Sequence, residues 1–348
     1  TRGGARCLLP ATRPATLAAA NATQDSLRLS WTPGEARDCV FARWRVEIRP
    51  DNRAAWAPAQ GCGGLAPRGA TSCLAGGLQS NRLHEFRVME ECTNANVSST
   101  WAYSAAPTST LIMPAGVPTG ITTNNPTASS LMLQWQAPDL NDCAFSRYVV
   151  EWRPAGSGAA WAVPAGCTAL TSACESLCTA TGLPSNAQAV FRVSVACASA
   201  SANSPPSAEF TSVATRPVPS DAPTGVAVGG ITSTGARASW TAAALNDCNF
   251  TGWSVVVTDV ANSQPVAPQA DCENLAFATV SCELSGLTCN TDHSVQVSAV
   301  CSDPHARSAA SAAAAFRTTR GGAQCLLPAT RPTGLTAANA TRDSLRLS

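Results

Sequence analysis

The sequence predicts an all-β protein, built as a tandem array of small antiparallel β-sandwiches that disulfides staple. Short runs alternate apolar and polar residues with a period of two, and sustained i, i+3, i+4 apolar patterns are missing. A Trp that ends one such run recurs at Trp31, Trp135 and Trp240, in steps of 104 and 105 residues. Each unit therefore has the size of one small sandwich, about 100 residues.

A longer period contains the shorter one. Residues 319–348 repeat residues 1–30 with five differences, at a constant offset of 318. Self-similarity at a fixed period is typical of repeat arrays, and 318 residues hold three units. We therefore expect a segment of a longer repetitive protein. Its expected parts are a linker from the preceding repeat (1–10), three domains (11–113, 114–217 and 218–318), a linker (319–328) and the first strands of a fourth domain (329–348).

Within each unit the strand-like motifs follow one order. In the first unit, Trp31 precedes the alternating run 43–49 (RWRVEIR), a Gly77-Leu78 turn and the run 86–88 (FRV). Apolar residues at 44, 46 and 48 face one side of such a strand, and the charged residues between them face the other. The order repeats after Trp135 and Trp240 and resembles the fibronectin type III family. The resemblance implies a tandem array of fibronectin-III-like antiparallel β-sandwiches.

One position departs from the family pattern. The tyrosine that secures a corner of the family's sandwich, two residues before the Phe, corresponds to His84, Ala189 and His293 here. The buried hydroxyl is therefore lost, and cysteines are the natural candidates to secure the corner.

The 16 cysteines indicate a disulfide framework. Twelve recur in register at steps of 104 or 105: Cys39/143/248, Cys62/167/272, Cys73/178/282 and Cys92/197/301. Even sets at fixed spacing imply disulfides and an oxidising, extracellular compartment. Zinc is disfavoured, because no CxxC pair occurs and the three His follow no ligand spacing.

The pairing follows from the strand order that the resemblance implies. The start of the third strand then lies beside the end of the sixth, and the other two cysteines bracket one short loop. The expected pairs are Cys39–Cys92, Cys143–Cys197, Cys248–Cys301, Cys62–Cys73, Cys167–Cys178 and Cys272–Cys282. The swapped pairing within each unit stays open, because all four cysteines are expected near one pole.

Four cysteines stand outside this framework. Cys289 lies in a turn at the pole where its domain ends, and Cys325 lies in the linker that leaves that pole, so we pair them. Cys7 occupies the position of Cys325 one repeat earlier and is expected to bond to the preceding repeat. Cys174 is then left over, as a free thiol or an intermolecular bond.

Composition limits the partners. Charged residues make up 13% of the chain and the net charge is +1, so nucleic-acid binding is not indicated. No stretch approaches the 18 or more apolar residues of a membrane span. N-glycosylation sequons occur at Asn21, Asn96, Asn249 and Asn339. The Pro/Ser/Thr linkers and Ser204 fit either O-glycans or stiff spacers, and we favour the spacers.

Catalytic signatures are missing. No nucleophile elbow, P-loop, HExxH or EF-hand pattern occurs, so we expect no enzyme activity and no cofactor. Asp38, Asp142 and Asp247 recur before a cysteine in all three units, which favours a turn or backbone-capping role. The expected function is a self-associating, glycosylated protomer of an extracellular filament, appendage hair or wall fibre. The alternatives are an adhesion or receptor ectodomain and the spacer of a secreted carbohydrate-active enzyme.

Overall fold

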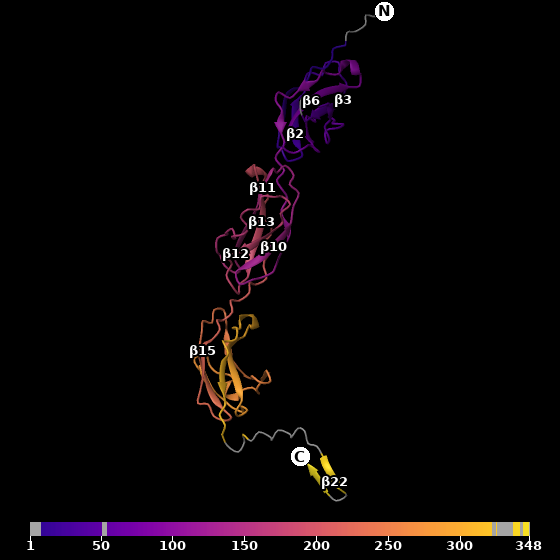
Figure 1. Cartoon of the computed structure of the whole chain (residues 1–348). Coiled ribbons are helices and arrows are strands. Elements are labelled where there is room, and N and C mark those ends of the chain that lie inside the picture. Colours follow the sequence, from indigo (N-terminus) through magenta and orange to yellow (C-terminus); the bar gives the residue numbers. More distant parts are fainter. Residues whose placement is uncertain (1–7, 51–53, 322–324, 326–336, 342–343, 348) are drawn as a thin grey trace, which may run out of the picture. The chain divides into compact units, whose positions relative to one another are not determined.

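Three β-sandwiches follow one another along the chain (Figure 1), which confirms the all-β fold class. The computed structural model describes residues 8–50, 54–321, 325, 337–341 and 344–347. Each sandwich is described by itself below. Within residues 8–50 and 54–321, the helical segments are single turns of 3-10 helix at Ala95–Val97, Ala200–Ala202, Ala270–Cys272 and Pro304–Ala306.

The first sandwich packs the sheet β1-β2-β5 against the sheet β4-β3-β6-β7, in which β8 also pairs with β6. All described pairs are antiparallel. The strands are β1 (Ala15–Ala20), β2 (Leu27–Thr32), β3 (Phe41–Arg49), β4 (Ala57–Pro58), β5 (Ser72–Ala75), β6 (Leu83–Cys92), β7 (Ala102–Tyr103) and β8 (Thr108–Ser109).

The second and third sandwiches repeat this pairing, as β9-β10-β12 with β11-β13-β14 and as β15-β16-β19 with β18-β17-β20-β21. In the second they are β9 (Thr119–Asn124), β10 (Ser130–Gln136), β11 (Phe145–Pro154), β12 (Leu177–Thr181), β13 (Ala189–Cys197) and β14 (Phe210–Thr211). In the third they are β15 (Thr224–Gly229), β16 (Ala236–Thr241), β17 (Phe250–Asp259), β18 (Gln264–Pro265), β19 (Ser281–Leu284), β20 (Asp292–Cys301) and β21 (Ala314–Arg317). Nearer the C-terminus, β22 (Ala337–Thr341) pairs with β23 (Ser344–Leu347).

The recurring Trp is the centre of each core. Trp31 packs edge-on against Trp44, with 5.6 Å between ring centroids, as edge-to-face aromatic pairs prefer. Trp135 with Tyr148 and Trp240 with Trp253 repeat this pair. The alternation predicted for 43–49 also holds, because Trp44, Val46 and Ile48 are buried. The repeat in the sequence is therefore a repeat of core contacts.

Hydroxyl side chains join the last segment of each sandwich to the long strand beside it. In the second sandwich, Ser207 donates its backbone N–H to the carbonyl of Val193, and its Oγ accepts the N–H of Val193, at 2.9 and 3.0 Å. Ser204 with Val195 and Ser212 with Ala189 form the same two-bond unit. The other sandwiches repeat it at Ser99, Ser104, Thr110, Ser308, Ser311 and Thr318.

This two-bond unit works because a hydroxyl both accepts and donates a hydrogen bond. Buried backbone groups of the long strand are therefore satisfied where the last segment does not follow a regular β ladder. We call these residues the hydroxyl bridges.

Histidine takes the place of the corner tyrosine in two sandwiches. The Nε2 of His84 lies 3.2 Å from the carbonyl oxygen of Gln79, and that of His293 lies 3.1 Å from the carbonyl of Thr288. Both rings are buried. In the second sandwich Ala189 has no side-chain group that could form this hydrogen bond. The carbonyl oxygen of Pro184, which corresponds to that of Gln79, accepts a hydrogen bond from the hydroxyl of Thr215. The expectation that cysteines replace the tyrosine is therefore wrong for this contact.

Candidate functional site

The cysteines lie at the ends of strands that the fold brings together. Cys39 precedes β3 and Cys92 ends β6, and the structure joins them with 5.5 Å between Cα atoms. Cys143–Cys197 and Cys248–Cys301 occupy the same place in the other sandwiches. The short loops are closed by Cys62–Cys73, Cys167–Cys178 and Cys272–Cys282. These are the pairs expected from the strand order, and not the swapped ones.

Two further cysteines join a linker to a sandwich. Cys289 lies in the turn before β20, and it is bonded to Cys325, whose Cα lies 5.8 Å away. Cys325 lies in the linker that follows the third sandwich. Cys7 is outside the described residues.

Cys174 is exposed and forms no disulfide in the structure. It projects from the loop that Cys167–Cys178 closes. Beside it, the hydroxyl of Tyr148 donates to the carbonyl oxygen of Ala173 at 3.0 Å. Burial raises the pKa of the Tyr148 phenol, so the hydroxyl keeps the proton that this bond needs. The loop therefore presents one thiol from an anchored backbone.

Alkylation of the folded protein without reductant is expected to modify Cys174. It is exposed, whereas the 14 disulfide-bonded residues have no thiol to react. Mass spectrometry of the peptide that contains Cys174 measures the result, and Cys289 and Cys325 are the comparison sites. Recovery of Cys289 and Cys325 as two alkylated peptides would contradict the assigned pair.

Three of the four predicted glycosylation sites are exposed. Asn21 lies in the turn between β1 and β2, Asn96 in the 3-10 turn Ala95–Val97, and Asn249 directly after Cys248. Asn339 lies in β22. Among the residues considered for O-glycans, Thr110, Thr215 and Ser204 are buried and hydrogen-bonded, so these three hydroxyls are not accessible to O-glycosylation in the folded chain.

The recurring aspartates hold the segment that leads into each sandwich. Asp38 accepts the N–H of Leu9 at 2.8 Å, and its own N–H donates to the carbonyl of Leu9. Asp142 with Met113 and Asp247 with Val218 repeat both bonds. This is the backbone-capping role that the repetition favoured. Each sandwich thus binds its own leading segment through the same two-bond contact.

Sequence reasoning missed an arginine and tryptophan stack on the outer face of the first sandwich. The guanidinium of Arg87 lies 4.7 Å from the ring centre of Trp56 and 4.2 Å from that of Trp101. Arg49 also stacks on Trp56, and Arg45 on Trp101. Such contacts are cation–π interactions. We name these five residues, with Arg43 and Tyr103, the stacked face.

Acidic side chains complete the stacked face. Glu47 accepts from Arg45 and Arg87, and it is buried beneath them, although its strand position faces outward. Arg43 pairs with Glu91 at 2.8 Å and holds the pKa of that carboxyl below its ordinary value. The charged residues of the run 43–49 therefore form ion pairs and aromatic stacks on this face. A smaller stack, Arg153 and Arg192 on Trp161, lies on the second sandwich.

A sequence signal for the stack existed. Trp56 and Trp101 are not at the positions of the recurring core Trp, so they are free to serve another purpose. Their partners lie on β3 and β6, which only the folded sandwich brings beside them.

The comparisons identify the sandwiches. Residues 116–213, which hold the second sandwich, match the model of the fibronectin type III domain. The second sandwich is therefore a fibronectin type III domain, and the first and third sandwiches repeat its strand pairing. No curated protein matches the chain. A crystal structure of the chicken CNTN1 FN1–FN3 domains is similar, with 17% identity over 89% of this chain and 100% of that one, at a TM-score of 0.32.

The fold and its bonds support a general assignment. Disulfides persist in oxidising compartments, so fibronectin type III domains with this many disulfides indicate an extracellular location. They support a structural or adhesive role. In the part of the chain that the structure describes, no helix has the length and apolar character needed to cross a membrane.

Proposed function

We propose that this chain is part of a protomer of an extracellular glycosylated filament, appendage hair or wall fibre. One observation carries the proposal: the first thirty residues return after 318 residues with five differences. A periodic assembly requires identical contacts at identical intervals, and a head-to-tail arrangement that does not close generates a filament. Arrays that recognise separate ligands have less reason to return to the same unit.

The short connections between domains support the proposal. Leu111 is hydrogen-bonded to Thr23 and Asn81 of the first domain, and Met113 is bonded to Asp142 of the second. Arg216 and Val218 are bonded in the same way on either side of Pro217. At each junction, a single residue, Ile112 or Pro217, separates the residue bonded to one domain from the residue bonded to the next. Such connections suit an element that bears load.

Covalent bonds support the same function. Lys is absent from the sequence, so a Lys–Asn isopeptide bond cannot form, and cysteine remains as the cross-linking residue. The bond between Cys289 and Cys325 extends this reinforcement to the linker after the third domain. Cys174 is available for a bond between neighbouring chains.

An adhesion or receptor ectodomain is the second candidate. The stacked face favours it, because the first domain carries this surface and the described residues 218–318 of the third form no such arginine–aromatic stack. Surface residues that differ between repeated domains are typical of ligand binding.

Imaging and mass measurement of native material test the proposal. We expect electron micrographs to show fibres with a regular axial repeat, and peptides with Asn21, Asn96 and Asn249 to carry N-glycans. The oxidised chain of 348 residues is also expected to associate as its concentration rises. Dispersed monomers in both native and recombinant material would favour the ectodomain. Unmodified masses for all sequon peptides would contradict the secretory part of the proposal.

A further inference from the structure

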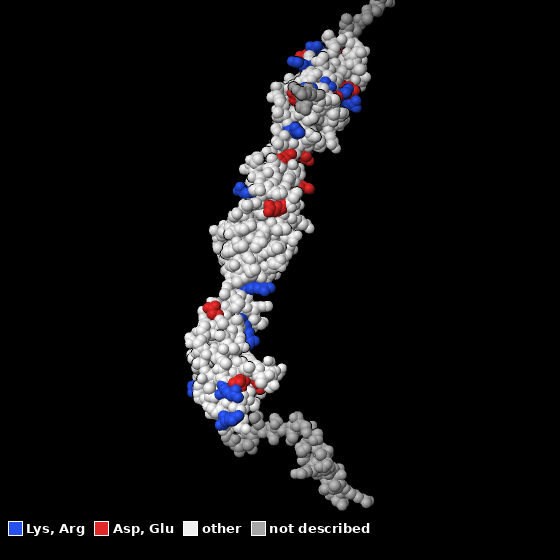
Figure 2. Space-filling model, in the orientation of Figure 1, with Lys and Arg blue, Asp and Glu red and all other residues white. Residues whose placement is uncertain are grey.

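Charge is unevenly distributed among the three domains. Residues 11–113 contain ten Arg against eight Asp and Glu, whereas residues 218–318 contain three Arg against eight Asp and Glu. Charged side chains gather on the first domain in the space-filling view (Figure 2). The net charge of the chain is therefore close to zero although the first domain is basic and the third domain is acidic. The 318-residue repeat returns both domains at the same interval of sequence.

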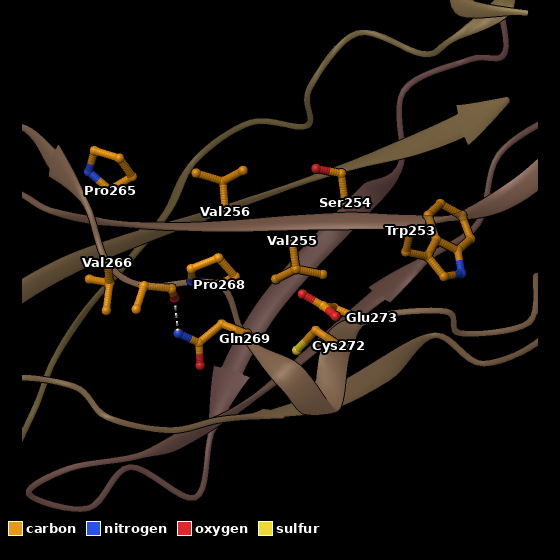
Figure 3. A pocket seen from close by; sticks show the side chains of 11 residues that line it. Trp253, Ser254, Val255, Val256, Pro265, Val266, Pro268, Gln269, Cys272 and Glu273 are labelled. Atoms are coloured by element: carbon orange, nitrogen blue, oxygen red, sulfur yellow. Dashed lines mark hydrogen bonds between the residues drawn. The ribbon is translucent and has the colours of Figure 1, made fainter.

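The acidic domain has a pocket beside strand β17. It measures about 350 Å³ and lies between β17 and the segment 265–273. Figure 3 shows Trp253, Val255 and Glu273 around it, with the disulfide-bonded Cys272 below. Val256, on the adjoining outer face, is 44% exposed. The pocket thus combines apolar side chains with the polar Ser254 and Gln269 and the carboxylate of Glu273.

In the first and second domains, a hydrogen-bonded segment covers the position that corresponds to this pocket. The backbone N–H of Trp44 donates to the carbonyl of Leu65, and that of Tyr148 donates to Leu170. These bonds seal the free edge of β3 and of β11 with a crossing segment. In the third domain, Phe277 instead stacks on the ring of Trp253, and the edge of β17 lines the pocket. The opening therefore belongs to the acidic domain.

Glu273, the carboxylate that lines this pocket, has no partner of opposite charge among the described residues. Elsewhere in the domain, Asp292 pairs with Arg317, and Glu283 lies near Arg237. Asp271 and Glu273 are exposed on either side of Cys272, and no arginine pairs with them in the described part of the chain. An unpaired carboxylate at the pocket, with a second one two residues earlier in the chain, fits a guanidinium attached to an apolar or aromatic surface.

The stacked face of the first domain has this chemistry. Arg43 and Arg45 keep 55% and 53% of their side chains exposed despite their bonds to Glu91 and Glu47. A guanidinium has five N–H donors, so each can accept a second carboxylate. Trp101 lies against Arg45 on this face, and Tyr103, whose ring centroid is 5.8 Å from that of Trp56, is 56% exposed. The face therefore offers arginine beside aromatic carbon.

We infer that the stacked face of one copy docks on the acidic pocket of the third domain of a second copy. The inference rests on the proposed function, because it supplies the lateral contact of the assembly. Complementary charge fixes the register of two surfaces. Neighbouring chains shifted by two domains bring the basic and acidic domains together, and the 318-residue period repeats this contact along the array.

Charge reversal on each surface tests the inference. The sample is the oxidised 348-residue chain carrying Cys174→Ser, which removes covalent dimers, and sedimentation velocity measures association. Arg43→Glu with Arg45→Glu, and separately Asp271→Arg with Glu273→Arg, are each expected to weaken association at least tenfold. The four changes together are expected to restore it. Salt is expected to weaken the original contact, because it screens exposed charges.

A matched control separates this contact from net charge. Arg28→Glu with Arg82→Glu makes the same charge change at exposed positions of the first domain away from the stacked face, and it is expected to leave association unchanged. Circular dichroism confirms that every variant is folded. Equal weakening by the control, or no restoration in the fourfold variant, overturns the docking. A chain that associates normally in all variants removes the docking but keeps the proposed assembly; an original chain that stays monomeric removes both.

Discussion

Replacing Arg68 by Met is expected to destabilise the first domain by about 3 kcal/mol, because it leaves a buried carboxylate without its partner. The guanidinium of Arg68 binds Glu90 through two nitrogens, at 2.6 and 3.0 Å, and also donates to the carbonyl of Gly34. Glu90 is fully buried on β6. Hydrogen exchange read by mass spectrometry resolves the effect, since β6 peptides report on this domain and β13 peptides on its neighbour.

The second domain supplies the control for this change. Val195 stands where the first domain has Glu90, and it is buried in the core. Arg68→Met combined with Glu90→Val therefore removes both charges and follows a solution that the chain already uses. We expect the double variant to recover most of the lost protection, because well-packed apolar residues replace buried ion pairs at little cost. A double variant as unstable as Arg68→Met alone would show that packing, and not the unpaired charge, causes the loss.

Removing the hydroxyl bridges of the second domain is expected to unfold it. Ser204, Ser207 and Ser212 each accept a backbone N–H of β13 through Oγ. Alanine at all three positions leaves three buried donors unpaired, at about 1–3 kcal/mol each. The sum approaches the whole stability of a domain, about 5–15 kcal/mol. Protection of β13 peptides from hydrogen exchange is expected to collapse, while that of β6 peptides stays.

Two comparisons show whether the hydroxyl is the cause. Ser199→Ala with Ser201→Ala removes two exposed hydroxyls of the same domain and is expected to have little effect. Ser207→Thr keeps the hydroxyl, as Thr215 already does at the bridge to Ala187. We expect Ser207→Thr to lower the hydrogen-exchange protection of β13 less than Ser207→Ala does. Equal losses for Thr and Ala at position 207 would contradict the role assigned to the bridge.

The repeated residues made the fold predictable. Trp31, Trp135 and Trp240 mark the same strand of each domain, and alternation along β3 determines which of its side chains reach the core. Strand order then places Cys39 beside Cys92, because antiparallel neighbours bring the start of one strand to the end of the other. Local patterns and one topological rule are sufficient for these features.

Contacts between distant segments could not be predicted in the same way. The sequence shows that His293 replaces a tyrosine, but its bond to Thr288 depends on the path of the turn between them. Trp101 reaches Arg87 only because the last segment folds back over β6. The hydroxyl bridges lie in a stretch of Ser, Ala and Pro without a period of its own. Such sites depend on tertiary distances that no local pattern encodes.

The disulfide between Cys39 and Cys92 determines how far the domain can stretch under force. Its two ends are 53 residues apart in sequence, and the corresponding bonds in the other domains span 54 and 53. At about 3.4 Å per extended residue, each bond withholds roughly 180 Å of contour length from a chain that is pulled apart. A domain that yields therefore lengthens only through the residues outside this loop. Beyond that length, further extension requires breaking a covalent bond.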